Sequence, residues 1–317
     1  MSVRGVAVPT QVRARLALTA GAVLAVAAAT AAFFTAATVP DGSTDPTRLP
    51  IGDGRVSSAP RVGYVWSCNQ EFFGGGAFAS GAWIRRDGTF DVTAKPTVDG
   101  SVKWPSQFSV ARDGDQRLML GNDLPSHATG TFPISPSDDA FQYDRNPNAI
   151  RAQNVRVSMP AIPASAAQPA CLPMGPVGVL LTGAYLFNAL DARGEDAVAH
   201  EIQDGCQGHP EMRGAYHYHN LTTCIADSAD TTAHSALVGY AFDGFGIFGR
   251  RGEGGKELVN ADLDECHGHT HAIMWDGERR VMYHYHATWE YPYTIGCFRG
   301  TPSPDVARGG SRGRGDS

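Results

Sequence analysis

The stretch Cys266-His-Gly-His-Thr-His-Ala-Ile-Met-Trp-Asp-Gly-Glu-Arg-Arg-Val-Met-Tyr-His-Tyr-His286 decides how this chain folds near its functional residues. At its centre, Asp276-Gly277 separates two runs that carry apolar side chains. An Asp-Gly pair between such runs is the strongest short signal for a β-hairpin with a two-residue turn. If the turn holds only these two residues, Trp275 pairs with Glu278, and this pair sets the register of the whole hairpin.

That register brings histidines together. It places His269 opposite His284 and His267 opposite His286, with all four on one face and His271 beside them. Directly opposite Cβ atoms in a hairpin lie about 4.5–5.5 Å apart. A bulge at Gly268 would move the outer pair to the other face. The opposite face is the predicted core side, and it carries Met274, Val281, Tyr283 and Tyr285.

The tetrapeptide Tyr-His-Tyr-His occurs twice, at 216–219 and at 283–286. Each copy follows an Asp-x-Cys-x-Gly-His pattern, at 204–209 and 264–269, and each precedes a further cysteine. Ten of the eleven histidines fall between residues 200 and 286. The repeated pattern indicates a duplication with a shared role.

Alternate residues of a strand share a face, so the two histidines of each tetrapeptide point the same way, about 6.5 Å apart at the backbone. Imidazole is the commonest protein ligand for transition metals, and nitrogen-rich sites suit copper or zinc. A metal ion is therefore the expected cofactor and partner. The alternative is a structural role, in which the histidines bond backbone carbonyls. The predicted metal ligands are His209, His217, His219, His267, His269, His284 and His286.

The N-terminal segment predicts export. Three arginines precede an alanine-rich apolar run over residues 16–39, which is the pattern of a secretory signal with cleavage after Ala37. Because the run approaches the roughly 20 apolar residues that span a bilayer, an uncleaved anchor is the alternative, and no other membrane attachment is expected. Both interpretations place the protein outside the cytoplasm, secreted or at the cell surface.

Six cysteines in an oxidising compartment predict disulfide bonds. Equivalent loops of the duplication would each close on their own bridge, which leaves the two remaining cysteines for each other. Thiolate ligation of zinc is less favoured because the chain has no Cys-x-x-Cys pair. The expected pairs are Cys206–Cys224, Cys266–Cys297 and Cys68–Cys171.

Composition indicates a globular protein that is mainly β, or α+β with few short helices. Hydrophobic residues make up 42% and charged residues 18%, and the net charge of −6 with no basic stripe excludes nucleic acid as a partner. The predicted organisation is a signal peptide or anchor over 1–37, a linker over 38–60, one β-rich domain over 61–300 and a disordered tail over 301–317. A division into two subdomains near residue 170 is an alternative.

Local signals give further elements. Asp-Gly pairs predict hairpins, an apolar run predicts one or two buried strands, a proline-rich stretch predicts irregular or edge structure, and a short helix is expected before the first cysteine motif. These features lie at 87–88, 99–100 and 113–114 for the Asp-Gly pairs, 177–190 for the buried strands, 133–176 for the edge structure and 195–202 for the helix.

Several longer motifs resemble the YHYH protein family, a group of exported proteins, over residues 121–300. The resemblance implies no particular activity. It implies that His209, His217, His219, His267 and His284 are shared with relatives, whereas His269, His271 and His286 are local additions. The motifs are Gly121-Asn-Asp-Leu-Pro-Ser-His-Ala-Thr-Gly130, Leu186-Phe-Asn-Ala-Leu-Asp191, Ala199-His-Glu201, Cys206-Gln-Gly-His209, Gly214-Ala-Tyr-His-Tyr-His219, Gly239-Tyr-Ala-Phe-Asp-Gly244, Leu263-Asp-Glu-Cys-His-Gly268 and Tyr291-Pro-Tyr-Thr-Ile-Gly-Cys-Phe-Arg-Gly300.

Three functions are compatible with these residues: an exported metal-binding protein, a metal-dependent hydrolase, and a surface module that binds a wall polymer. A hydrolase needs an open metal position and a carboxylate that accepts a proton from bound water. No catalytic residue is assigned. The carboxylates considered are Glu201, Asp204, Asp243, Asp264 and Glu265, and the aromatic residues considered for polymer contact are Tyr216, Tyr218, Trp289, Tyr291 and Tyr293.

Overall fold

The Asp276-Gly277 pair forms the two-residue turn between β15 (Gly268–Trp275) and β16 (Glu278–His286). Both turn residues have positive φ, 51° and 84°, as a type I′ turn requires. The register runs without a shift along the whole of β15 and puts His269 opposite His284. The predicted hairpin is therefore confirmed over both strands.

The prediction of which face of this hairpin is buried is correct only at the end far from the turn. Tyr283 and Tyr285 are buried, but Met274 and Val281 are 62% and 74% exposed. The reason is that the strand next to β16 is short and pairs only with its last residues. Nearer the turn the hairpin extends beyond the sheet, and its other face is buried instead, with the indole of Trp275 bonded to a backbone carbonyl.

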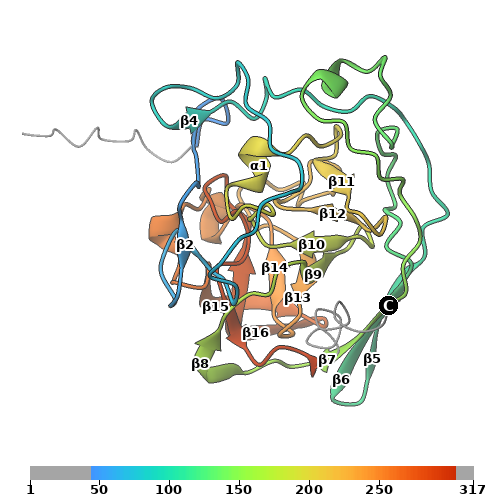
Figure 1. Ribbon diagram of the computed structural model, residues 1–317. Coiled ribbons are helices and arrows are strands. Elements are labelled where there is room, and N and C mark those ends of the chain that lie inside the picture. The colour runs from blue at the N-terminus through green and yellow to red at the C-terminus, as the bar shows by residue number, and fades with distance from the viewer. Residues whose placement is uncertain (1–43, 305–317) are drawn as a thin grey trace, which may run out of the picture. The chain divides into compact units, whose positions relative to one another are not determined.

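The hairpin supplies the two strands at one edge of an eight-stranded sheet, whose strand order is β11-β12-β10-β9-β13-β14-β16-β15 (Figure 1). The order is symmetric about its middle. The central strands β9 and β13 are antiparallel, and each half contains one parallel pair, β10 with β12 or β14 with β16. The other six strands are β11 (Gly208–Pro210), β12 (Tyr216–Tyr218), β10 (Tyr185–Phe187), β9 (Pro176–Leu180), β13 (Leu237–Ala241) and β14 (Gly246–Phe248).

The duplication seen in the sequence is thus a local two-fold relation in the fold, centred on the pair Val179–Tyr240. Gly178 and Gly239 are equivalent positions beside this centre. A Cβ atom on Gly178 would lie 2.7 Å from the Tyr240 carbonyl oxygen, and one on Gly239 would lie 2.7 Å from the Val179 carbonyl oxygen. Both halves therefore need glycine for the central strands to approach each other.

Small sheets surround the large one. They are a three-stranded sheet in the order β5-β6-β7 and three two-stranded sheets, β1-β4, β2-β3 and β8-β17. These strands are β1 (Leu49–Pro50), β2 (Val56–Ser57), β3 (Val65–Trp66), β4 (Thr89–Phe90), β5 (Phe108–Asp113), β6 (Gln116–Gly121), β7 (Val155–Pro160), β8 (Ser165–Ala170) and β17 (Phe298–Gly300). The protein is mainly β, as predicted, with one four-residue α-helix, α1 (Ala197–His200), and three 3-10 turns, Asp139–Gln142, Glu253–Gly255 and Asn260–Asp262, among residues 44–304.

Some local predictions are confirmed, among them edge structure within 133–176, and others are wrong. Of the three early Asp-Gly pairs, only the one at 113–114 lies at a hairpin between two long strands, β5 and β6. The stretch 133–176 contains β7 and β8, which are edge strands of their sheets. Residues 44–60, predicted as a linker, belong to the fold, because β1 and β2 pair with later strands and Leu49 is 1% exposed.

This computed structural model describes residues 44–304. The predicted signal or anchor over 1–37, the start of the predicted linker and the tail from residue 305 lie outside the described residues. Residues 44–304 belong to one compact unit, without a division near 170. Within this range no helix has the length and apolar character that a membrane crossing requires.

Three disulfide bonds join Cys68 to Cys171, Cys206 to Cys224 and Cys266 to Cys297, which is the pairing expected from the duplication. The second and third bridges close equivalent loops in the two halves. Disulfide bonds persist mainly in oxidising compartments, so three of them suggest an extracytoplasmic protein.

Candidate metal centres

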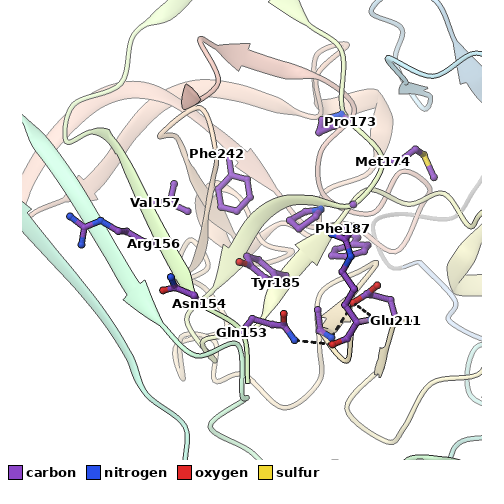
Figure 2. Close-up of a pocket in the computed structure, with 14 residues that line it drawn as sticks. Gln153, Asn154, Arg156, Val157, Pro173, Met174, Tyr185, Phe187, Glu211 and Phe242 are labelled. Carbon is purple, nitrogen blue, oxygen red and sulfur yellow. Dashed lines mark hydrogen bonds between the residues drawn. The ribbon is translucent and has the colours of Figure 1, made fainter. Parts of the chain in front are cut away.

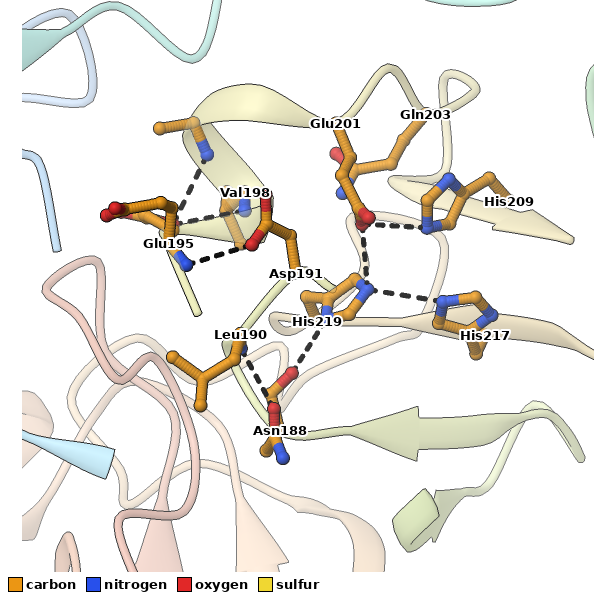
Figure 3. Close-up of polar contacts among 12 residues, drawn as sticks. Asn188, Leu190, Asp191, Glu195, Val198, Glu201, Gln203, His209, His217 and His219 are labelled. Carbon is orange, nitrogen blue, oxygen red and sulfur yellow. Dashed lines mark hydrogen bonds and ion pairs between the residues drawn. The ribbon is translucent and has the colours of Figure 1, made fainter. Parts of the chain in front are cut away.

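The first cluster, called the Glu201 site, consists of Glu201, His209, His217 and His219 and lies between α1, β11 and β12 (Figure 3). The Nε2 atoms of His209 and His219 lie 3.1 and 3.0 Å from Oε2 of Glu201. The Nε2 atoms of His217 and His219 lie 3.2 Å apart. A tetrahedral zinc ion with bonds of about 2.0–2.1 Å holds its ligand atoms about 3.3 Å apart. The donor atoms of the three imidazoles lie within 4.8 Å of one another, and Glu201 contacts His209 and His219.

Backbone carbonyls fix which ring nitrogen faces this cluster. Nδ1 of His219 lies 2.6 Å from the Asn188 carbonyl oxygen, and Nδ1 of His217 lies 3.2 Å from the Ala215 carbonyl oxygen. A carbonyl only accepts, so each Nδ1 carries a proton and each neutral ring directs an Nε2 lone pair inward. Two such lone pairs at 3.2 Å repel each other, and a cation between them removes the repulsion.

The local charges agree with a cation at this point. Burial raises the pKa of Glu201, but His209 and His219 outweigh burial and lower that pKa well below its ordinary value of 4.5. Burial lowers the pKa of His219, but Glu201 beside it brings the net shift above 6.5. Burial and two neighbouring imidazoles lower the pKa of His217. The site thus holds an anionic carboxylate that stabilises positive charge at His219, whereas His217 stays neutral.

A buried lysine positions Glu201. Asp196 caps the N-terminus of α1, and the helix ends at Glu201, whose backbone is extended. The Lys95 ammonium donates to the carbonyl oxygens of Val198 and Glu201 at 2.5 and 2.8 Å and to Oε1 of Gln203 at 2.7 Å. Lys95 therefore holds the turn after α1 in the conformation that aims Glu201 at the histidines.

The second cluster, called the His234 site, contains five imidazoles whose donor atoms all lie within 4.8 Å of one another. Two come from β15, two from β16 and one from the loop before β13. The Nε2 atoms of two of them, His234 and His286, lie 3.1 Å apart. The Nε2 atoms of the other three are buried without a hydrogen-bond partner. The members are His234, His269, His271, His284 and His286.

Burial holds four imidazoles of the His234 site, those of His234, His269, His284 and His286, neutral. Nδ1 of His286 lies 2.6 Å from the Gly249 carbonyl oxygen, and Nδ1 of His234 lies 2.8 Å from the Ser235 carbonyl oxygen. Burial, with a smaller effect of neighbouring imidazoles, lowers the pKa of His284 to about 2 and that of His269 to about 4. Neutral imidazole is the form that binds a metal ion.

The two sites occupy equivalent positions in the two halves of the large sheet. His219 bonds the carbonyl that follows β10, and His286 bonds the carbonyl that follows β14, both at 2.6 Å. Phe187 stacks on His217 with ring centroids 3.9 Å apart, and Phe248 contacts His284 edge-on at 5.0 Å. The sites differ in their remaining donors, which are a carboxylate in the first and two further imidazoles in the second.

His267, a predicted ligand, is not brought to the His234 site. It precedes β15, and its φ of 74° turns the side chain away from the histidine face. Its Nε2 lies 3.0 Å from the hydroxyl oxygen of Thr288 instead. The equivalent residue of the first half, Gln207, has the same left-handed backbone, with φ 63°. The backbone pairing with His286 is kept, since the His286 amide donates to the His267 carbonyl oxygen at 3.2 Å, but the left-handed backbone of His267 redirects its side chain, so the ligand prediction is wrong for this residue.

The predicted ligands left out three members of these clusters: His271 was expected beside the paired histidines, whereas His234 and Glu201 were not expected at the clusters. His234 stands alone in the sequence, far from either tetrapeptide, and no local pattern marks it. Glu201 was considered only as a proton acceptor, although the motif Ala199-His-Glu201 drew attention to it. Both join the histidines through tertiary packing.

Other carboxylates considered for proton transfer have structural partners. Asp204 accepts a hydrogen bond from the hydroxyl of Tyr216 at 2.9 Å, and Asp264 accepts one from the equivalent Tyr283 at 2.9 Å. The hydroxyl of Tyr285 bonds Asp243 at 2.5 Å. Tyr216, Tyr218, Tyr291 and Tyr293 are buried, so these four tyrosines do not form a polymer-binding surface.

A cavity of about 730 Å³ reaches the Glu201 site and is lined by all four of its side chains. A second cavity, of about 480 Å³, lies next to it and includes Tyr185 and Phe242 (Figure 2). The two share four lining residues, among them Met174 and Phe187. Both volumes fall in the range of about 300–1,000 Å³ that is typical of small-molecule sites.

Residues 156–258 match the sequence model of the family described as YHYH protein. The matched stretch is shorter than the range 121–300 over which the motifs predicted the resemblance. It includes the tetrapeptide at 216–219 and ends before the one at 283–286. Searches of curated proteins and of solved structures found no match.

Proposed function

We propose that this chain is an exported protein, secreted or held at the cell surface, that binds two transition-metal ions, one at the Glu201 site and one at the His234 site. The disulfide bonds and the N-terminal signal pattern support export. The observation that carries metal binding is the convergence of buried Nε2 atoms whose Nδ1 partners are backbone carbonyls.

A purely structural role for the histidines accounts less well for this geometry. A structural histidine would use both ring nitrogens in hydrogen bonds, as His200 does with Ala79 and Asp53. In the His234 site, Nε2 of His269, His271 and His284 has no partner. Buried polar atoms without partners are costly, and a bound metal ion would satisfy all of them at once.

The donor sets favour different ions. The Glu201 site offers three nitrogens and one oxygen, a set that zinc accepts in tetrahedral or five-coordinate geometry. The His234 site offers only imidazole nitrogens, which suit copper(II) as well as zinc. We therefore propose zinc for the first site and copper or zinc for the second.

Metal analysis of the purified exported protein tests this proposal. The parent protein, loaded with zinc or copper and then dialysed, is expected to retain two ions per chain. His217→Ala and His284→Ala should each retain one ion, and the double variant none. His127→Gln is the matched control, because His127 belongs to neither site, and it should retain two. Retention of no metal by a folded, disulfide-intact parent would refute the proposal.

A further inference from the structure

The two sites differ in how completely their side chains fill a coordination shell. Five imidazoles converge at the His234 site, whereas three imidazoles converge at the Glu201 site, which borders a cavity. Structural metal sites are closed by protein ligands, and reactive sites keep a position open beside a pocket. The Glu201 site therefore has the features of a centre that accepts an external ligand.

The adjoining cavities extend this site in one direction. Met174 and Phe187 border both cavities, and Phe187 also stacks on His217. The two cavities therefore adjoin at these two side chains. Together the cavities accommodate an elongated organic molecule better than a small ion such as acetate.

The second cavity is lined by charged and aromatic side chains. Arg156, on β7, and Arg213 line it together with Glu211, whose Oε1 accepts hydrogen bonds from the backbone amides of Arg213 and Ala215. Neither guanidinium group has an ion pair or side-chain hydrogen bond among residues 44–304. The rings of Tyr185 and Phe242 lie in the same cavity (Figure 2). Guanidinium groups bind carboxylates in bidentate geometry, and aromatic walls accept an apolar segment.

We propose that the Glu201 site binds an elongated organic anion, with an oxygen or nitrogen donor on the metal and a carboxylate at Arg156 and Arg213. This inference rests on the proposed metal binding. The aromatic walls contact the segment between the two ends of the ligand. The His234 site, with five protein donors, takes no such ligand.

Cobalt(II) and a series of hydroxamates test the inference. The His284→Ala variant, loaded with cobalt, leaves only the Glu201 site occupied, and its visible absorption reports ligands on the metal. Acetohydroxamate is compared with monohydroxamates of succinic, glutaric and adipic acid, which carry a carboxylate at increasing distance. The best of these should bind at least tenfold more tightly than acetohydroxamate.

Adding Arg156→Ala and Arg213→Ala should abolish that tenfold preference and leave cobalt content and acetohydroxamate affinity unchanged. Arg86→Ala, an exposed arginine outside both cavities, is the matched control and should keep the preference. The His217→Ala variant, which isolates the His234 site, should show no hydroxamate-dependent change.

The outcomes separate the two proposals. Failure of cobalt to bind either site refutes metal binding itself. Cobalt bound at the Glu201 site without a spectral response to any hydroxamate would show that the site is closed. Equal affinities across the series, or a preference that survives loss of both arginines, would overturn the assignment of the second cavity.

Discussion

Replacing His267 by glutamine distinguishes a buried structural histidine from the proposed metal ligands. Gln207 occupies the equivalent left-handed position in the first half of the fold, so His267→Gln introduces a residue that this turn already accommodates. Burial lowers the pKa of His267 to about 3 from its ordinary value of 6.5. The side chain is 2% exposed, so solvent does little to screen this effect.

The sign of the pH dependence follows from proton binding. Below pH 6.5 the unfolded chain protonates His267 while the folded protein keeps it neutral, so the free energy of unfolding falls as pH decreases towards 3. The contribution is about 1.36 kcal/mol per pH unit, or about 2.7 kcal/mol between pH 7.5 and pH 4.5. The glutamine variant lacks this loss. Between pH 7.5 and pH 4.5, the free energy of unfolding of the variant should therefore rise by about 2.7 kcal/mol relative to that of the parent.

Urea unfolding with EDTA present, at pH 7.5, 6.5, 5.5 and 4.5, measures this difference without interference from bound metal. At pH 7.5 the variant should be less stable by about 1 kcal/mol, because it loses the hydrogen bond to Thr288. Parallel curves for parent and variant would show that His267 is not held neutral by burial. Loss of one metal ion per chain in His267→Gln would instead identify it as a ligand.

Three further predictions concern the metal sites and the stability of the fold. Glu201→Gln removes the only charged donor of its site and should release that site's metal on dialysis while the His234 site keeps its own; unchanged metal content would refute the ligand role. Gly178→Ala and Gly239→Ala should each lower the free energy of unfolding by about 1–3 kcal/mol, because each added Cβ would meet a carbonyl oxygen of the neighbouring central strand. Gly205→Ala is the control and should not lower it, because no atom lies within 4 Å of the added Cβ. Equal thermal midpoints for the three variants would contradict this prediction. Replacing the Cys68–Cys171 pair with serines opens a loop closed over a separation of 103 residues and should cost about 4.7 kcal/mol in urea unfolding; a loss below about 1 kcal/mol would refute the chain-entropy argument.

Local signals in the sequence were enough for the hairpin and its histidine pairs. The turn at Asp276-Gly277 has only one common geometry, and a fixed turn determines every pair in the ladder until the strand ends. The duplicated cysteine pattern likewise indicated which cysteines close equivalent loops. Both inferences hold because the deciding residues are neighbours in the chain or copies of one unit.

Tertiary structure decided the rest. It brings His234, which no local pattern marks, and Glu201, at the end of α1, to the two clusters, and it removes the His267 side chain through a single left-handed residue. It also buries one end of the hairpin's predicted core face and exposes the other, because β14 is shorter than β16. Periodicity and turn chemistry act over a few residues, whereas a ligand shell and an open cavity depend on which distant segments pack together.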